Sequence, residues 1–356
     1  MSEGVVGNTG TAEEGALRVG VYWPGLAGQA DQLERIAAAA GTAPVVWNEG
    51  APPPDVEALV GGGAPETVPE GTPRLRLFQS VSAGADWLVD HPLWRSEVIL
   101  CTASGVHGVQ IPEHVMLLLL ALRRHLPEYL SAQRRHIWRH DAVGDGGVSI
   151  APRELYGQTL GLVGYGHIGR GVAHLARAFG MRVLAVTPSA KEETPLDLTA
   201  TAPFVDPPAL PRPELGPDLM LPLADLPRLL AASDAVVVCV PLTPQTKGLI
   251  DATALGQMKP GALLVNIARG SIIDEDALLR ALRDGRLAGA GLDVTTEEPL
   301  PASSPLWEMP QVIITPHVSG QSEHYAERTV NILLANLDRL RRGEQLLNAV
   351  DRARGY

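Results

Sequence analysis

Short apolar segments alternate with helical stretches from Leu17 onward. The first part of the chain has candidate strands at 17–23, 44–47, 75–80 and 97–101, and a candidate helix at 31–40. Alternation of this kind predicts a parallel sheet covered by helices. Clusters of Gly and Pro at Ala51–Pro54 and Gly61–Ala64 indicate loops.

A long helical segment from Pro112 to about His140 follows, with Pro127 expected to kink or divide it. Beyond the glycine-rich stretch Val143–Val148 a second α/β series begins. Its candidate strands are 158–163, 181–186, 234–240, 262–267, 288–294 and 311–316, and its candidate helices include 168–179 and 275–283. This pattern does not assign the last helical segment, about 321–342, to one domain or the other.

Two regions depart from the pattern. Residues 1–16 have no apolar periodicity and are expected to be a flexible tail. The stretch 188–223 holds so many prolines that neither a helix nor a central strand is expected there, so we predict a surface excursion at the edge of the second sheet.

Composition narrows the class of protein. A chain of 356 residues with 45% hydrophobic and 19% charged residues is a globular protein of two domains. The net charge of −11 argues against nucleic acid as a partner. The one basic cluster, Arg123–Arg139, alternates with Leu126, Leu130 and Trp138, which predicts the solvated side of an amphipathic helix.

No membrane segment or signal peptide is expected. The longest apolar run, Val115–Leu122, is far shorter than the roughly 20 residues that a membrane span needs. The N-terminus lacks a basic region followed by an apolar one. Cys101 and Cys239 each lie in an apolar strand, so we expect buried thiols and no disulfide. These features predict a cytoplasmic enzyme.

A glycine-rich turn follows the strand at 158–163 and opens a helix. Its sequence is Gly164-Tyr165-Gly166-His167-Ile168-Gly169. In this spacing the first glycine allows the tight turn, the second admits a pyrophosphate, and the third permits close packing of helix on strand. The amides and partial positive charge of the helix N-terminus attract the anion. The segment predicts a dinucleotide site.

The end of the next strand bears on the choice between NAD and NADP. An acid there binds the ribose 2′-OH of NAD, but this chain has Thr187, followed by Pro188 and Ser189. A 2′-phosphate would therefore meet no repelling carboxylate at this position, and Ser189 and Lys191 are candidate contacts for it. A loop acid serving NAD is the alternative, so both cofactors stay open.

Four residues near the C-terminus are candidates for chemistry. Arg269, Asp293, Glu298 and His317 lie at or just beyond the carboxyl ends of predicted strands, where open α/β sheets bind ligands. An arginine matches a carboxylate with two parallel hydrogen bonds, a histidine exchanges a proton near neutral pH, and a neighbouring glutamate fixes its tautomer. The set suits reduction of a 2-keto acid. No metal site is expected, because ligand spacing of the zinc kind is missing.

Seven segments together resemble the D-isomer-specific 2-hydroxyacid dehydrogenase family over nearly the whole chain. They are LFQSVSAGAD, ASGVHGVQIPEHV, ELYGQTLGLVGYGHIGR, VPLTPQTKGLI, MKPGALLVNIARGSIIDEDAL, GLDVTTEEPLP and VIITPHVSG. The resemblance implies that Arg269 binds the substrate, that His317 is the acid/base, and that Glu298 pairs with His317. Family spacing favours Glu298 over its neighbour Glu297.

The resemblance also implies the architecture and the remaining contacts. It implies two Rossmann-like or flavodoxin-like α/β domains with parallel sheets and a cleft between them. Residues 17–122 with 319–356 would bind the substrate, 123–318 would bind the dinucleotide, and a homodimer is expected. The other implied contacts are Asp293 at the nicotinamide, Thr243 and Ile267 beside the cofactor, and the amides of Val81, Ser82, Ala83 and Gly84 at the substrate carboxylate.

Some interpretations stay open at this stage. Trp47 is a candidate for lining the substrate pocket, with packing as the alternative, and His107 is a weaker candidate for the same cleft. The substrate is expected to be a small 2-keto acid, with glyoxylate and hydroxypyruvate suggested by resemblance. The alternative functions are a formate or phosphite dehydrogenase and a non-enzymatic dinucleotide sensor. In formate dehydrogenases a glutamine replaces the glutamate that pairs with the histidine.

Overall fold

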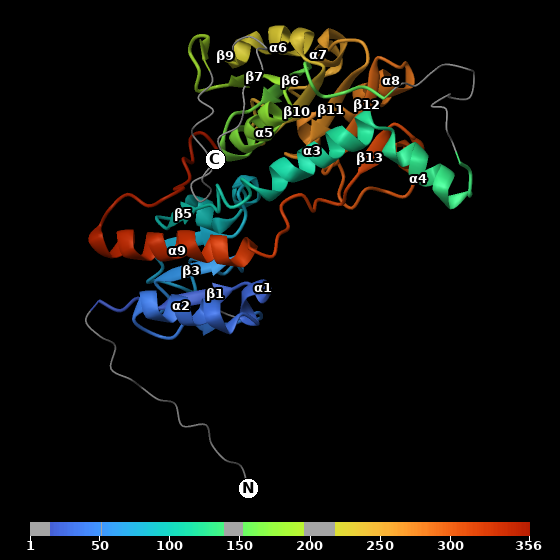
Figure 1. The fold of residues 1–356 in the computed structure, drawn as a ribbon. Helices are drawn as coiled ribbons and strands as arrows, with labels where there is room; N and C mark the ends of the chain where they lie inside the picture. The colour runs from blue at the N-terminus through green and yellow to red at the C-terminus, as the bar shows by residue number, and fades with distance from the viewer. Residues whose placement is uncertain (1–14, 51, 139–151, 196–217) are drawn as a thin grey trace. The chain divides into compact units, whose positions relative to one another are not determined.

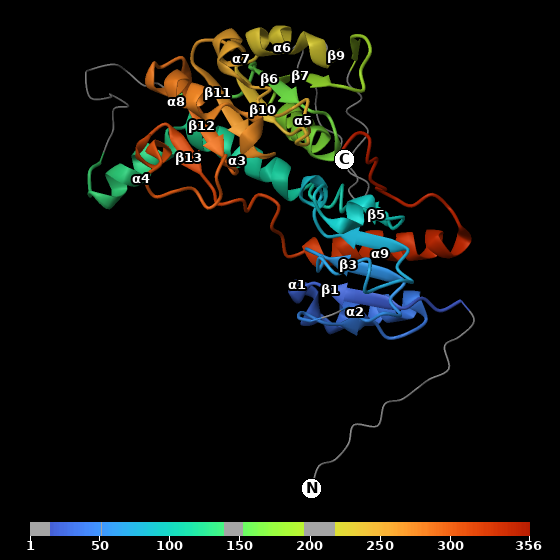
Figure 2. The same cartoon turned by 180° about the vertical axis from the view of Figure 1, so that it is seen from behind.

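The computed structural model describes residues 15–50, 52–138, 152–195 and 218–356 and divides the chain into two units. The first unit comprises 1–106 with 323–356, and the second comprises 107–322. Figures 1 and 2 show each unit as a sheet with helices against it. The predicted tail, apart from Gly15 and Ala16, and the glycine-rich stretch Val143–Val148 lie outside the described residues.

The first unit contains a five-stranded, all-parallel sheet in the order β2-β1-β3-β4-β5. Its strands are β1 (Val19–Tyr22), β2 (Val45–Val46), β3 (Ala58–Gly61), β4 (Leu77–Ser80) and β5 (Ile99–Cys101). This is the flavodoxin-like order. β1 pairs with β3 in the register Val19↔Ala58 to Tyr22↔Gly61.

Helices α1 (Pro24–Ala27), α2 (Ala30–Ala40) and α9 (Tyr325–Arg342) belong to this unit. Apolar side chains of α2 and α9, among them Ile36 and Leu333, share one core with β1, β3 and β4. This packing answers the question that the sequence left open, because the C-terminal helix completes the first unit. Strand β3 was not predicted, because its four residues are all buried and apolar and therefore show no alternation.

The second unit contains an eight-stranded sheet in the order β13-β12-β11-β10-β6-β7-β9-β8. The strands are β6 (Thr159–Val163), β7 (Arg182–Thr187), β8 (Thr194–Pro195), β9 (Leu219–Pro222), β10 (Ala235–Val238), β11 (Ala262–Asn266), β12 (Leu287–Leu292) and β13 (Val312–Ile314). Every neighbouring pair is parallel except β8 with β9. Without β8, the strands outward from β6 follow the Rossmann order with one strand added at the β13 edge.

Helices cover both faces of this sheet (Figure 1). α3 (Gln110–Arg123) and α5 (His167–Ala178) share a core with one face, and α6 (Leu226–Ala232), α7 (Ala252–Gln257) and α8 (Glu275–Arg283) share a core with the other. The predicted α/β class with parallel sheets is confirmed.

The chain passes from one unit to the other at 106/107 and 322/323, whereas the sequence analysis placed the domain boundaries at 122/123 and 318/319. The reason is the packing of α3. A Cβ at Gly291 of β12 would lie 3.0 Å from the Cβ of Leu118, and one at Gly289 would lie 3.1 Å from a methyl carbon of Leu122. Helix α3 therefore packs directly on the second sheet and belongs to the second unit.

The long helical segment is divided, as Pro127 led us to expect. α3 ends at Arg123, His125 takes a left-handed conformation (φ 54°), and α4 (Leu126–Arg134) starts with Pro127 in its first turn. The amphipathic interpretation was wrong, since Leu126 and Leu130 are exposed at 41% and Trp138 is exposed at 91%. Arg123, conversely, is buried and donates a hydrogen bond from Nη2 to Asp234 O at 2.6 Å.

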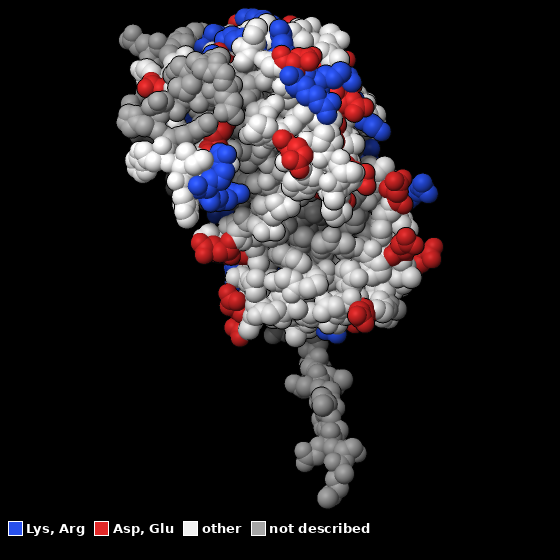
Figure 3. Space-filling view, turned by 90° about the vertical axis from the view of Figure 1, so that its right-hand side faces the viewer, with Lys and Arg blue, Asp and Glu red and all other residues white. Residues whose placement is uncertain are grey.

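The stretch 188–223 was expected to be a surface excursion without a central strand, but it contributes β8 and β9 to the second sheet, and β9 is paired on both sides, with β7 and with β8. β8 and β9 are the outermost strands on that side and end in Pro195 and Pro222, while 196–217 lie outside the described residues. On the face drawn in Figure 3, basic and acidic side chains of the described residues lie close together near the top, whereas the middle of the face is largely uncharged.

Three further findings concern the cysteines, the helices and the metal-ligating side chains. Both cysteines are free thiols, and burial raises the pKa of Cys101 to about 12. Among the described residues, none of the helices has the length and apolarity to cross a bilayer. That same part of the chain contains no group of three or more metal-ligating side chains.

Candidate active site

The glycine-rich turn has the geometry of a phosphate site. Gly164 has φ 108°, and a Cβ there would lie 2.8 Å from the carbonyl oxygen of Cys239. A Cβ at Gly169 would lie 2.6 Å from Gly164 O, which explains the third glycine. A Cβ at Gly166 would meet no described atom within 4 Å, so this is the open side, and α5 begins at the next residue.

Tyr165, His167 and Ile168 supply the side chains of the turn. Tyr165 is buried, with the guanidinium of Arg170 5.2 Å from its ring centroid. Burial and the nearby Arg170 hold the pKa of His167 below its ordinary value, so its imidazole is neutral at pH 7. Ile168 packs, half-buried, against the core beneath α5.

Strand β7 ends at Thr187 without an acid. The chain turns back there, with Ala190 N donating to Thr187 O at 3.2 Å and the hydroxyls of Thr187 and Ser189 3.0 Å apart. Lys191 is exposed beyond the turn. The loop acid Glu193 is paired with Arg228 of α6 at 2.5 Å.

Arg269 follows β11 in an extended conformation, with φ −145°. Its Nη1 donates to Ala268 O at 2.7 Å, and its own carbonyl accepts from Asn266 Nδ2 at 2.9 Å. The next residue must be glycine, because a Cβ at Gly270 would lie 2.0 Å from the carbonyl carbon of Thr295. The loops after β11 and β12 therefore run in backbone contact.

His317 and Glu298 meet as predicted. His317 Nδ1 lies 2.8 Å from Glu298 Oε2, while Glu298 Oε1 accepts from Thr295 N at 3.1 Å. The two side chains are 48% and 37% exposed. Glu297 contributes its carbonyl oxygen to Thr295 Oγ1 instead, so Glu298 is the partner.

Asp293 is buried and holds the segment 315–319 that carries His317. Its carboxylate accepts hydrogen bonds from Thr315 Oγ1 at 2.6 Å and from the amides of Val318 and Ser319 at 3.0 Å each. Its carbonyl accepts from His317 N at 2.8 Å. Burial alone would raise the pKa of Asp293, but these hydrogen bonds, with one from the Ser319 hydroxyl, outweigh it and lower the pKa.

Two polar residues of this network were not predicted. Thr315 lies only two positions before His317, but nothing in the sequence indicated that its hydroxyl would bond to Asp293. His114 of α3, 201 positions earlier, has Nε2 3.0 Å from Thr315 Oγ1. No local pattern connects residues so far apart. Thr243 and Ile267, expected beside the cofactor, are both buried just beyond β10 and β11.

The candidates in the first unit follow β4 and β2. The amides of Val81 and Ser82 already donate, to Gly61 O and to Ser80 Oγ, both at 3.0 Å. Within the described part of the chain the amides of Ala83 and Gly84 have no acceptor.

Trp47 packs closely on β1. A Cβ at Gly20 would lie 2.7 Å from its ring, and the ring of Tyr22 lies 5.5 Å away. These contacts favour the packing interpretation. His107, in the second unit, places Nδ1 3.0 Å from Gln110 Nε2, which also donates to Gly320 O at 3.0 Å.

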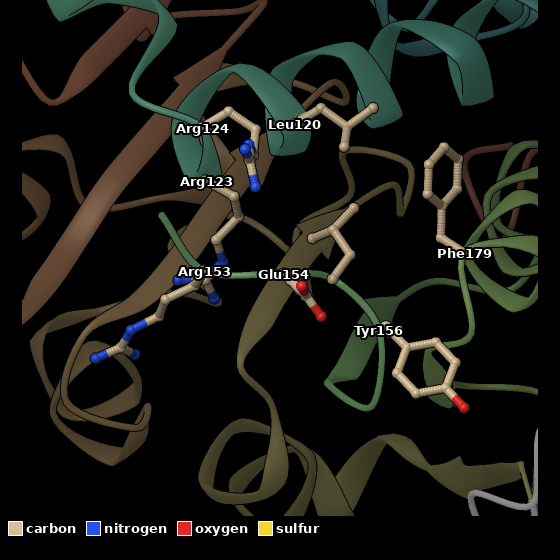
Figure 4. A pocket seen from close by; sticks show the side chains of 8 residues that line it. Leu120, Arg123, Arg124, Arg153, Glu154, Tyr156 and Phe179 are labelled. Atoms are coloured by element: carbon tan, nitrogen blue, oxygen red, sulfur yellow. The ribbon is translucent and has the colours of Figure 1, made fainter. Parts of the chain in front are cut away.

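A pocket of about 260 Å³ in the second unit lies apart from these groups. Figure 4 shows Arg123, Arg124, Arg153, Glu154, Tyr156 and Phe179 around it, together with leucine side chains. None of the residues singled out for chemistry lines this pocket, so we place the candidate site at the carboxyl ends of β11–β13.

Known proteins resemble this chain over most of its length. Residues 116–319 match the family model described as the D-isomer specific 2-hydroxyacid dehydrogenase NAD binding domain. The chain is 33% identical to the glyoxylate reductase of Pyrococcus furiosus over 293 residues, 82% of this chain and 81% of that one.

The chain belongs to the D-isomer specific 2-hydroxyacid dehydrogenase family. It is 35% identical to the D-3-phosphoglycerate dehydrogenase of Mycobacterium leprae over 280 residues, 77% of this chain but only 47% of that protein. Among solved structures, the family member from Xanthobacter autotrophicus Py2 in complex with NADPH and MES has a TM-score of 0.77 at 29% identity, covering 96% of this chain and 100% of that chain. The predicted class, an NAD(P)-dependent oxidoreductase with a Rossmann domain, is confirmed.

Proposed function

We propose that this dehydrogenase interconverts a small 2-keto acid and its 2-hydroxy acid, with His317 as the acid/base. The observation that carries the proposal is the 2.8 Å contact between His317 Nδ1 and Glu298 Oε2 at the end of β13. A formate dehydrogenase would pair its histidine with glutamine, so the carboxylate favours the keto-acid reaction. A pure dinucleotide sensor needs no such pair.

Glu298 sets the tautomer of His317. An ionised carboxylate only accepts hydrogen bonds, so it holds a proton on Nδ1 and directs Nε2 to the substrate. In reduction, protonated His317 donates its Nε2 proton to the carbonyl oxygen as C2 gains hydride. In oxidation, neutral His317 takes the hydroxyl proton through Nε2. The carboxylate stabilises the imidazolium that this cycle requires.

Arg269 anchors the substrate carboxylate in this proposal. A guanidinium offers two parallel N–H groups to a carboxylate. The extended backbone at Arg269 and the close contact at Gly270 fix the position of the Arg269 Cα, from which the side chain extends. The Ala83 and Gly84 amides are the remaining candidates from the first unit, since those of Val81 and Ser82 already have acceptors. Trp47 is left with the packing interpretation.

The glycine-rich turn fits a dinucleotide, because the open space at Gly166 and the N-terminus of the 12-residue helix α5 suit a pyrophosphate. The bound nicotinamide supplies or accepts the hydride. Thr187 leaves room for a 2′-phosphate, with Ser189 and Lys191 as its contacts, and the pairing of Glu193 with Arg228 neutralises a nearby acid. We therefore propose that NADP is accepted.

The decisive experiment measures initial rates with glyoxylate, hydroxypyruvate, pyruvate and a bulkier 2-keto acid, each with NADH and with NADPH. We expect consumption of reduced cofactor with the smaller acids, since relatives of this chain are named glyoxylate reductase. Tight cofactor binding without turnover on any of these acids would contradict the proposal and favour a sensing role.

The homodimer is also a proposal. The exposed apolar residues of α4 and the segment after it, Leu126, Tyr129, Leu130 and Trp138, are unusual for a helix facing water and support a second copy as partner. Light scattering on the full chain tests it. A monomer at micromolar concentration would refute it.

A further inference from the structure

A buried polar chain runs from helix α3 to the turn that carries His317. His114 Nε2 lies 3.0 Å from Thr315 Oγ1, and Thr315 Oγ1 donates to Asp293 Oδ1 at 2.6 Å. The His114 side chain is 14% exposed, and the Asp293 side chain is fully buried. All three residues belong to the second unit.

The direction of each hydrogen bond follows from the number of protons available. Thr315 has a single hydroxyl proton, and the carboxylate of Asp293 receives it. The hydroxyl oxygen can then only accept from His114, so Nε2 of His114 carries a proton. Burial lowers the pKa of His114 and the carboxylate 3.8 Å away opposes this only partly, so the imidazole is neutral at pH 7.

Asp293 passes this constraint to the turn. The oxygen that accepts from Thr315 also accepts the Val318 amide, and the other oxygen accepts the Ser319 amide. These bonds enclose His317, whose backbone has the left-handed φ of 53°. A residue other than glycine avoids this conformation unless its surroundings impose it.

We propose that His114 is a positioning residue, which orients Thr315 and Asp293 and thereby fixes the turn that presents His317 to the substrate. The inference rests on the proposed role of His317. His114 touches neither reacting atom in this arrangement and acts through two intermediates. Its loss removes the donor to Thr315, leaves the hydroxyl free to rotate from the carboxylate, and loosens the turn.

The test compares two substitutions at His114 with a matched control. His114→Leu removes the donor, whereas His114→Gln retains an N–H at a similar reach. His174→Leu is the control, since His174 is a half-buried histidine of the neighbouring helix α5 whose Nε2 has no partner among the described residues. Hydrogen exchange of peptides covering 312–321 reports on the turn directly.

We expect amide exchange in this segment to become about tenfold faster in His114→Leu, and kcat for keto-acid reduction to fall about tenfold or more. His114→Gln should restore both properties to within about threefold of the wild type, and His174→Leu should change neither.

Two outcomes overturn the proposal. One is His114→Leu with wild-type exchange and kcat, and the other is His114→Gln as impaired as His114→Leu. Should His114→Leu fail to fold, Thr315→Val breaks the same connection and must accelerate exchange of the same peptides. The exchange result is independent of turnover, so a His317 variant that keeps its activity would overturn the proposed function without deciding this one.

Discussion

Replacement of His317 by asparagine separates the proton transfer from the shape of the turn. His317 has φ 53°, a conformation that asparagine tolerates better than alanine does. Alanine would add backbone strain of about 1 kcal/mol, which asparagine avoids. His317→Asn therefore removes the proton donor with the smallest disturbance of the backbone.

The expected loss of stability in His317→Asn is much smaller than the expected loss of rate. The lost contact with Glu298 joins side chains that are 48% and 37% exposed, so it contributes at most about 0.5 kcal/mol to stability. That corresponds to a fall in Tm of about 2 °C or less for a unit of this size. Loss of a general acid lowers the rate by about 10²- to 10⁴-fold, or about 3 to 5 kcal/mol in the barrier.

The assay is kcat for reduction of the best keto acid, measured with the Kd for NADPH and the Tm of the same preparation. His136→Asn is a matched control, because His136 is an exposed histidine after α4 with φ 56°. We expect kcat to fall at least a hundredfold in His317→Asn alone, with unchanged cofactor binding. A variant within about threefold of the wild-type kcat would refute the assignment of His317.

Three further predictions concern the cofactor, the loop contact and pH. Thr187→Asp should weaken NADPH binding about tenfold relative to NADH, because a carboxylate repels the 2′-phosphate, and unchanged relative Kd values in a fluorescence titration would count against our placement of that phosphate. Gly270→Ala should lower the Tm by several degrees, since its Cβ would overlap the Thr295 backbone, whereas Gly256→Ala in α7 meets no described atom and should leave the Tm equal or higher. The folded-state pKa of Asp293 lies below the ordinary 3.8, so its stabilising effect is complete above that value and is lost as pH falls through the lower folded-state pKa. The Tm difference between wild type and Asp293→Asn should therefore shrink in acid, and a difference that does not change with pH would contradict this.

The sequence was most informative where one strand or one turn carried its own signal. The strands flanking the glycine-rich turn, and the turn itself, appear where the apolar runs and glycine spacing placed them. Prediction failed where a strand was buried on both faces and where apolar side chains of a helix were exposed. β3 is too short and too completely buried to alternate, and α4 exposes the leucines that an amphipathic helix would pack against a core.

The pairing of Glu298 with His317 could be expected from the sequence, but the other contacts around it could not. Glu298 and His317 are 19 positions apart on neighbouring segments, and their pairing followed from the motif. His114 lies 201 positions from Thr315, and only the packing of α3 on the second sheet brings them together. The acceptor of the Val81 amide, Gly61 O at the end of β3, likewise depends on the pairing of β3 with β4, whereas the Ser82 amide bonds locally to Ser80 Oγ.

The loops after β11, β12 and β13 hold the candidate residues and are joined by backbone contact and by hydrogen bonds to backbone and side chains. Gly270 lets the loop after β11 contact Thr295, and Thr295 N in turn donates to Glu298. Asp293 receives amide hydrogen bonds from the segment of His317 on both its carbonyl and its carboxylate. A left-handed residue costs about 1 to 2 kcal/mol in a free chain, and several such bonds, at about 1 kcal/mol each, are enough to offset that cost. In the proposed mechanism the imidazole is therefore presented by a turn whose hydrogen bonds are formed before substrate arrives, which is the condition under which a general acid contributes its full effect on the rate.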